Sequence, residues 1–572
     1  MGTFWGVFLL ASYIIGASAE ESSVIVDSLL GKLEGTTFLS RAGREYYAFR
    51  GVPFAEKTER FQVSQLSKPW TGVKKATQFG NVCPQFDIFE KVFTGDEDCL
   101  FLNIYTPINK SDLVENGKKL PVMVWFNPGG FTFGKADFDP KFFMDEDIVL
   151  VTFNYRMGAF GFLDTGDDAI SGNLGLKDQV VALQWVQKTI SSFGGDSSKV
   201  TIFGCSAGGA SVHYHMLSPM SKGLFRNAIS QSGSVLAHWA IQRDPAGTSK
   251  FIGEDLKCPT ATSHELVDCL KTKTVQELLQ AHLNGVKWFM LPFNILAPSV
   301  ESKNSKQPLF LESDPLSLIT NGEFHRVPWI YGFTEDEGAQ LSTSIIMSET
   351  HLSEINEDWS RVMPIALGYD FIADKEVRDN VSRKLLTQYF GNEEISEETW
   401  ASFTHLFSDR FFIHPAEKAA RLQAQFTDIY PFEFTFPGEE DSPLLKNFYG
   451  ISGEYGVGHT DELQYQFSGA YGAVEHVDQH KHEVYEFSQN FVKLWASFAT
   501  DNKPTSTWKN EMQWKPIPRD VGDAPIQYYQ IAGKTSSVNN PGRHERMQFW
   551  DKLNVDNVDM KITPKIHNKI EL

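Results

Sequence analysis

Residues 200–210 read V-T-I-F-G-C-S-A-G-G-A and join a short apolar run to a segment of small residues. The run Val200–Phe203 is typical of a buried strand, and the segment after it has a helical pattern. Between them, Gly204, Ser206 and Gly208 form the pattern G-x-S-x-G. In this setting the glycines allow a sharp turn that pushes the serine hydroxyl out of the sheet, and the start of the next helix favours negative charge. The stretch predicts a strand–turn–helix unit with a nucleophile at its turn.

Other short apolar runs alternate with amphipathic segments along the chain. The runs are continuous, as in strands covered on both faces. Apolar residues from Val484 to Phe498 follow the spacing of one helix face. We therefore expect an α/β fold, with a large central, mainly parallel sheet flanked by helices. The further runs are Val122–Phe126, Ile148–Phe153, Val327–Tyr331 and Ile429–Phe436.

Length and charge narrow the class of protein. The 572 residues contain no repeat, no low-complexity stretch and no long linker, which favours one large domain. The formal net charge of −20 opposes binding to nucleic acid or anionic lipid, because both are repelled by a negative surface. A small or neutral partner fits this composition better.

The N-terminus predicts entry into the secretory pathway. Phe4–Ile15 is almost wholly apolar but too short to span a bilayer, and the cleavage pattern Ala17-Ser18-Ala19 follows it. We expect a signal peptide at 1–19, one domain at 20–560 and a tail at 561–572. No later stretch reaches transmembrane length, so no stable membrane span is expected. The final residues 569–572, K-I-E-L, imitate the K-D-E-L retrieval signal, so secretion and residence in the endoplasmic reticulum both stay open.

The cysteines and two sequons agree with that route. Two local pairs suit loop-closing disulfides, Cys83 with Cys99 and Cys258 with Cys269. Cys205 is left over, and we interpret it as a buried free thiol. The glycosylation sequons are Asn109-Lys110-Ser111 and Asn380-Val381-Ser382.

A serine hydroxyl needs a base, and the base needs an orienting acid, in the chain order Ser, acid, His. Residues 332–338, G-F-T-E-D-E-G, follow a predicted strand, and residues 456–462, G-V-G-H-T-D-E, lie in a later glycine-rich loop. Together they predict an acid in the first segment, which offers Glu335, Asp336 and Glu337, and a base at His459 in the second. A developing oxyanion also needs backbone N–H donors. Gly129 and Gly130, in the loop after a predicted strand, and Ala207 can supply them.

With these motifs the chain resembles a type-B carboxylesterase of the cholinesterase-like α/β-hydrolase family, most like the insect esterases. Residues 97–103, 172–179 and 193–196 match further family signatures. The resemblance implies Ser206 as nucleophile, Glu337 as acid, His459 as base, and the amides of Gly129, Gly130 and Ala207 as oxyanion hole. It also implies the same two disulfides and two structural ion pairs, Arg60 with Glu97 and Arg156 with Asp178.

The resemblance implies a serine carboxylesterase that hydrolyses carboxylic esters through an acyl-enzyme. The expected partner is a small-molecule ester, no metal or organic cofactor is implied, and the oligomeric state is not set. Three alternatives stay open: a catalytically silent adhesion or binding ectodomain, a juvenile-hormone esterase, and a neutral lipase. The pair His476 and His480 has the spacing of two helical metal ligands, but no H-E-x-x-H pattern accompanies it, so no metal site is predicted.

The chain departs from the family at three places near the expected site. Asn127-Pro128 replaces the usual His-Gly before Gly129, and proline has no N–H to donate. Loop 84–98 contains no tryptophan, whereas cholinesterases hold a quaternary ammonium there on an aromatic face. Choline esters are therefore not the expected substrates. Juvenile-hormone esterases usually have Gln where this chain has Cys205, which disfavours that alternative.

Overall fold

The computed structural model describes residues 23–115, 117–438, 441–472, 477, 483–505, 508, 513–533, 537–538 and 541–557. The predicted signal peptide, the K-I-E-L terminus and His476, His480 and His482 lie outside these ranges.

A single large sheet organises the described part of the chain. Thirteen strands form it, in the order β1-β2-β3-β7-β9-β8-β10-β11-β12-β13-β14-β15, with β4 beside β2. A separate pair, β5 and β6, lies in the loop between Cys83 and Cys99. The strands are β1 (Ser23–Ser28), β2 (Gly31–Leu39), β3 (Glu45–Pro53), β4 (Val73–Lys75), β5 (Gln85–Asp87), β6 (Val92–Thr94), β7 (Phe101–Thr106), β8 (Leu120–Phe126), β9 (Val149–Phe153), β10 (Gly195–Cys205), β11 (Asn227–Gln231), β12 (Trp329–Thr334), β13 (Ile429–Phe434), β14 (Tyr528–Ile531) and β15 (Ser537–Val538).

The centre of the sheet is parallel from β9 through β14, which confirms the predicted mainly parallel α/β sheet. The predicted runs became β8, β9, β10, β12 and β13, and every residue of β8 is buried. Strand β11 was missed because its sequence, N-A-I-S-Q, is polar. Its polar side chains are buried but paired: Asn227 donates to the carbonyl of Phe498, and Ser230 to that of Gly209.

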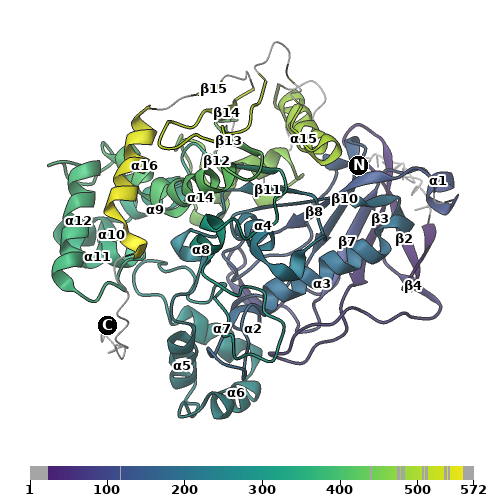
Figure 1. Ribbon diagram of the computed structural model, residues 1–572, viewed down its shortest axis with the longest axis horizontal. Coiled ribbons are helices and arrows are strands. Elements are labelled where there is room, and N and C mark those ends of the chain that lie inside the picture. Colours follow the sequence, from purple (N-terminus) through teal and green to yellow (C-terminus); the bar gives the residue numbers. More distant parts are fainter. Residues whose placement is uncertain are drawn as a thin grey trace, which may run out of the picture.

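Helices cover both faces of the sheet (Figure 1). On one face α3 and α4 pack against β8 and β10, and on the other α15 contacts the same two strands. The described α-helices are α1 (Lys110–Glu115), α2 (Gly158–Phe162), α3 (Leu174–Thr189), α4 (Ala207–Leu217), α5 (Pro245–Asp255), α6 (Ser263–Lys271), α7 (Val275–Leu283), α8 (Pro315–Thr320), α9 (Ala339–Ile346), α10 (Glu349–Glu357), α11 (Trp359–Ala366), α12 (Lys375–Tyr389), α13 (Trp400–Ser408), α14 (His414–Ala424), α15 (Glu483–Asp501) and α16 (Pro541–Leu553).

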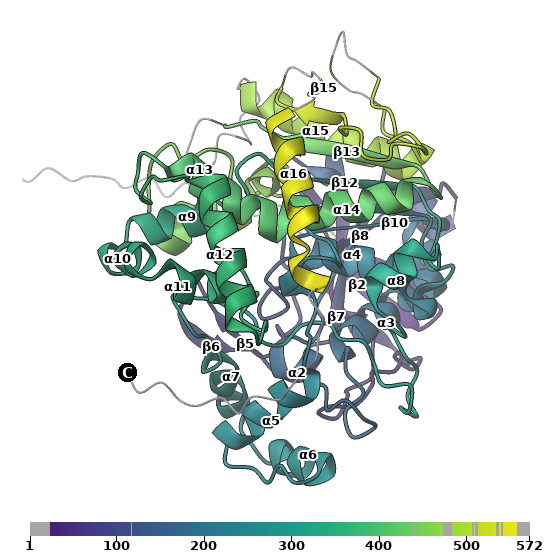
Figure 2. The same ribbon diagram turned by 60° about the vertical axis from the view of Figure 1, so that its left-hand side comes forward.

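Helix α16, near the C-terminus, packs against helices from the middle of the chain. Helix α16 runs beside α12 and α14 (Figure 2), where Trp550 donates a hydrogen bond of 2.7 Å to Tyr389 Oη. Arg546 Nε lies 2.6 Å from the buried carboxylate of Asp409. Asp409 begins the π-helical turn η5 (Asp409–Ile413), so α16 fixes a turn that, as shown below, reaches the candidate site.

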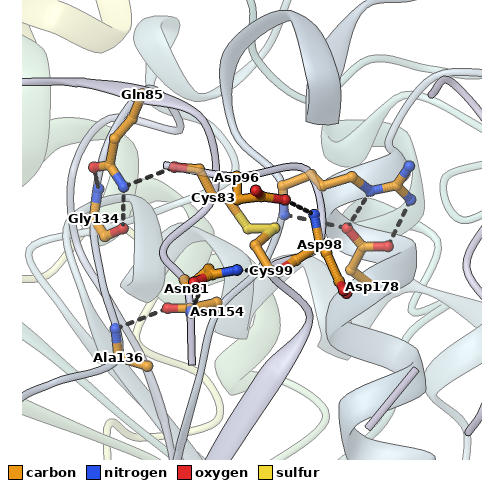
Figure 3. The surroundings of a disulfide bond; sticks show 11 residues. Asn81, Cys83, Gln85, Asp96, Asp98, Cys99, Gly134, Ala136, Asn154 and Asp178 are labelled. Carbon is orange, nitrogen blue, oxygen red and sulfur yellow. Dashed lines mark hydrogen bonds and ion pairs between the residues drawn. A yellow bond between two sulfur atoms is a disulfide. The ribbon is translucent and has the colours of Figure 1, made fainter. Parts of the chain in front are cut away.

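Both predicted disulfides are present. Cys83 and Cys99 are joined at an S–S distance of 2.04 Å, and Cys258 and Cys269 at 2.01 Å. Figure 3 shows the first bond and the polar side chains around it. No helix within the described ranges combines the length and apolarity needed to cross a lipid bilayer.

Candidate active site

The predicted turn at Ser206 forms between β10 and α4. Ser206 has φ 57° and ψ −122°, a region that residues with a side chain rarely adopt. Its backbone is held from outside, because its N–H donates to the carbonyl of Gln231 on β11 at 2.8 Å. Only glycine fits beside it: a Cβ on Gly208 would lie 1.9 Å from the carbonyl oxygen of Phe126. The turn therefore brings the start of α4 against the end of β8.

His459 and Glu337 meet although 122 residues separate them in the chain. Glu337 follows β12, His459 lies in the loop before η7 (Asp461–Tyr465), and His459 Nδ1 is 2.6 Å from Glu337 Oε2. The other carboxylate oxygen, Oε1, accepts a hydrogen bond from the N–H of Thr334 at 2.9 Å and another from Ser232 Oγ. The Glu337 side chain is fully buried, so both of its oxygens are engaged by the protein.

The histidine ring is held on its face as well as on its edge. Phe412, in η5, stacks on His459 with ring centroids 4.4 Å apart. The side chain of Gln340 donates to the His459 carbonyl. Because the edge is fixed by Glu337 and the face by Phe412, the ring has little freedom to rotate. No hydrogen bond joins His459 to Ser206 among the described residues; such contacts often form only when substrate is bound.

Three backbone N–H groups lie near the turn, two in the loop after β8 and one at the start of α4. Gly129 has φ 126° and Gly130 φ 60°, conformations that favour glycine. Neither of these N–H groups, nor that of Ala207, donates to an acceptor in the described part of the chain. Because Gly208 packs on the Phe126 and Asn127 carbonyls, this loop lies directly beside Ser206. Unpaired N–H groups in this arrangement can stabilise a negatively charged oxygen.

Aromatic rings line the region between that loop and the histidine. Phe293 lies against Gly130, where a Cβ would be 2.6 Å from its ring. Trp239 contacts Phe293 and Phe412 at centroid distances of 6.1 and 6.0 Å. The sequence contains no signal for Phe412, because nothing local marks an aromatic residue that only the tertiary fold brings to a site.

Near the turn lie the carboxyl group of Glu462, which the sequence did not single out, and the thiol of Cys205, which is free and buried as predicted. Glu462 Oε1 accepts from Gln231 Nε2 at 2.8 Å, while its Oε2 has no hydrogen-bond partner among the described residues. Burial, together with the nearby Glu337 carboxylate, raises the pKa of Glu462 to about 7. Burial likewise raises the pKa of the free thiol of Cys205, with the charges of Glu462 and Glu337 acting in the same direction. Cys205 is thus a protonated, buried thiol.

The raised pKa of Glu462 predicts a pH-dependent contribution to stability. The folded state holds the Glu462 proton more tightly than the unfolded chain, so this contribution is full below about pH 4.5 and is lost as pH rises towards 7. Relative to Glu462→Gln, the wild type should lose about 3 kcal/mol of unfolding free energy over that range, since each pKa unit corresponds to about 1.4 kcal/mol. Urea unfolding of both proteins at several pH values measures the difference. A pH-independent difference would contradict the assignment.

The sheet, the serine at its sharp turn and the histidine–glutamate pair together define an α/β hydrolase. A sequence model described as the Carboxylesterase family matches residues 22–550, and the chain belongs to that family. It is 33% identical over 557 residues to a carboxylic ester hydrolase of Bombus ignitus, covering 95% of this chain and 97% of that one. It is 34% identical to venom carboxylesterase-6 of Apis mellifera, with 92% and 94% covered.

A solved structure agrees with this assignment. The crystal structure of juvenile hormone esterase from Manduca sexta, with OTFP covalently attached, superposes with a TM-score of 0.80 at 26% identity. The match covers 93% of this chain and 99% of that one. The α/β-hydrolase fold is therefore confirmed, and the protein is a carboxylic ester hydrolase. Its two disulfides and its similarity to a venom enzyme are consistent with the secretory pathway.

Proposed function

We propose that Ser206, His459 and Glu337 hydrolyse carboxylic esters through an acyl-enzyme. The observation that carries the proposal is the 2.6 Å contact between His459 Nδ1 and Glu337 Oε2 in a fold that also places Ser206 on a strained turn. Ser206 Oγ attacks the ester carbonyl carbon while His459 takes the hydroxyl proton. The C–O bond to the alcohol then breaks, and His459 delivers that proton to the leaving oxygen.

Deacylation uses the same groups in reverse. A water molecule attacks the acyl-enzyme carbonyl while His459 removes its proton. The bond to Ser206 Oγ then breaks to release the acid, and His459 returns the proton to Ser206 Oγ. In both steps the carbonyl oxygen becomes negatively charged. We assign its stabilisation to the N–H groups of Gly129, Gly130 and Ala207, which have no other acceptor in the described residues. Pro128 supplies no donor and does not need to.

We propose uncharged esters as the preferred substrates. The rings near the reactive groups, Trp239, Phe293 and Phe412, suit an apolar acyl or alcohol group. In loop 84–98, Phe86 packs edge-to-face on Phe93 at 5.2 Å, and Phe89 lies 5.7 Å from Tyr471. Because these rings contact one another, their faces are less available to hold a quaternary ammonium, a contact worth about 0.5 to 2 kcal/mol.

A matched pair of thioesters tests this preference. Acetylthiocholine and its uncharged analogue, in which carbon replaces the quaternary nitrogen, differ only in charge. A cationic substrate keeps the long-range attraction of an acidic protein, which salt screens beyond about 8 Å. We expect kcat/KM to be higher for the uncharged thioester at physiological ionic strength. A preference for acetylthiocholine would contradict the substrate proposal. If the protein hydrolysed none of these substrates, aryl esters included, the esterase mechanism would be contradicted.

For the chain as a whole we propose a signal peptide at 1–19, a single catalytic domain at 20–560 and a tail at 561–572. The continuity of the sheet from β1 to β15 supports one domain. Asn109 and Asn380 are exposed, which supports glycosylation at both. The tail ending in K-I-E-L leaves two destinations for the mature protein, the extracellular space and the endoplasmic reticulum.

A further inference from the structure

The loop that carries Gly129 and Gly130 is held at its far end by a side chain from the Cys83–Cys99 loop. Gln85 Oε1 accepts a hydrogen bond from the N–H of Gly134 at 2.7 Å, and Gln85 Nε2 donates to the carbonyl of Gly134 at 3.0 Å (Figure 3). One amide group thus pairs both backbone groups of a single residue. Gln85 is 4% exposed, so water cannot readily replace either bond.

Gly134 and Gly129 belong to one tightly packed turn. The carbonyl of Gly129 accepts from the N–H groups of Thr132 at 2.9 Å and Phe133 at 3.1 Å. A Cβ on Gly129 would lie 1.9 Å from the Phe133 carbonyl oxygen, and one on Gly134 would lie 2.3 Å from Asn127 Nδ2. Within this closed turn, a shift of Gly134 moves Phe133, and Phe133 moves Gly129. Displacement at the Gln85 contact therefore reaches the N–H groups beside Ser206.

Gln85 is itself fixed by the loop that the disulfide closes. Its Nε2 donates a further hydrogen bond of 3.0 Å to the carbonyl of Cys83. Strand β5 begins at Gln85 and pairs with β6, which leads back to Cys99. Two residues beyond Gly134, Ala136 is anchored separately: its N–H donates to Asn154 and its carbonyl accepts from Asn103. Nearer the turn, the carbonyl of Phe131 accepts from the N–H of Gly158 at 2.8 Å and that of Gly130 from Asn294 at 3.1 Å. Between these bonds and Ala136, Gln85 is the side chain that fixes Gly134.

We propose that Gln85 is a positioning residue for ester hydrolysis, which transmits the fixed geometry of the Cys83–Cys99 loop to the N–H groups of Gly129 and Gly130. The inference rests on the proposed function, because it takes these two N–H groups as oxyanion donors. Gln85 touches neither substrate nor Ser206. Its effect should appear in the transition state, where the oxyanion is present, and not in the binding of the ester.

The test replaces Gln85 by methionine, which has similar length but neither donor nor acceptor. The control is Gln187→Met. Gln187 also pairs two backbone carbonyls, those of Ser197 and Leu224, at 2.9 Å each, but it lies near the opposite end of β10 from Ser206. We expect Gln85→Met to lower kcat for p-nitrophenyl acetate by roughly 10- to 100-fold with little change in KM, since misplacing a catalytic group by about 1 Å has effects of this size. Gln187→Met should leave kcat near that of the wild type.

A reversible inhibitor separates positioning from loss of structure. A trifluoromethyl ketone forms a tetrahedral adduct whose oxyanion needs the same N–H groups, whereas the corresponding alcohol binds without one. Affinity for the ketone should fall in Gln85→Met by the same factor as kcat/KM, with binding of the alcohol unchanged. Rates are expressed per active site, titrated with a fluorophosphonate. Should the methionine variant not fold, Gln85→Glu, which keeps the acceptor for the Gly134 N–H, is measured in the same way.

The outcomes distinguish this inference from the proposed function. A folded Gln85 variant with unchanged kcat, or with a lower kcat but unchanged affinity for the ketone, would overturn the role of Gln85 while wild-type activity still supports the Ser206 mechanism. A wild-type protein that neither reacts with the fluorophosphonate nor binds the ketone would overturn both. A parallel loss of kcat/KM and of ketone affinity in Gln85→Met alone supports the role of Gln85.

Discussion

Replacing Ser206 with alanine should abolish ester hydrolysis, with a loss in kcat of roughly 10³-fold or more, while the protein stays folded. Groups that act as a unit lose nearly all of their effect when one is removed. Structure should be retained because the turn is held through the backbone N–H of Ser206, which donates to the carbonyl of Gln231 and is kept in alanine. Initial rates on p-nitrophenyl acetate, compared with thermal unfolding of the same samples, give the result.

The matched control is Ser211→Ala in the same helix, α4. Ser211 is fully buried and accepts a hydrogen bond from Gln179 at 3.1 Å, so its loss should cost stability and not activity. A fluorophosphonate should label the wild type and Ser211→Ala, but not Ser206→Ala. Near-normal turnover by Ser206→Ala would rule out Ser206 as the nucleophile.

The candidate reactive residues left clearer signals in the sequence than the contacts that hold them. The turn at Ser206 could be predicted because it requires glycine on either side, which leaves a local pattern. The chain order that such a mechanism requires pointed to the acidic loop 332–338 and to His459, and the family resemblance then selected Glu337. The strands of the parallel core were predicted because burial on both faces makes them continuously apolar. In each case a physical requirement leaves its mark on neighbouring residues.

What could not be predicted depends on contacts between distant segments. Strand β1 reads S-V-I-V-D-S and alternates exposed with buried residues. Only three of its residues are apolar, so the sequence does not form an apolar run that would predict a strand. Phe412 reaches His459 only through the fold, and the hydrogen bonds of Gln85 to Gly134 span 49 residues. The raised pKa of Glu462 arises from burial, which a single sequence does not report. These features arise from tertiary contacts, and they leave no pattern among neighbouring residues from which they could be predicted.

The second large effect is expected at Glu337. Its Oε1 accepts from the backbone N–H of Thr334, a donor that cannot reverse its role. In Glu337→Gln the amide oxygen must therefore occupy that position, and the amide nitrogen must face His459 Nδ1 across the 2.6 Å contact. Because this NH₂ group can only donate, it selects the imidazole tautomer that carries its proton on Nε2. That tautomer cannot accept the proton of Ser206, so kcat should fall by roughly 10³- to 10⁴-fold.

The neighbouring Glu335 provides the comparison, because it lies in the same acidic loop. Its side chain has no hydrogen bond to another described residue, and burial raises its pKa to about 7, so Glu335→Gln should change kcat little. Glu337→Gln should keep its fold, since the amide retains the bonds to Thr334 and Ser232. The tautomer can be observed directly by ¹⁵N NMR of the His459 ring. Equal losses of kcat in the two variants would show that activity depends on the total charge of the loop. A loss of kcat in Glu337→Gln alone, with the His459 proton moved to Nε2, identifies Glu337 as the group that orients the base.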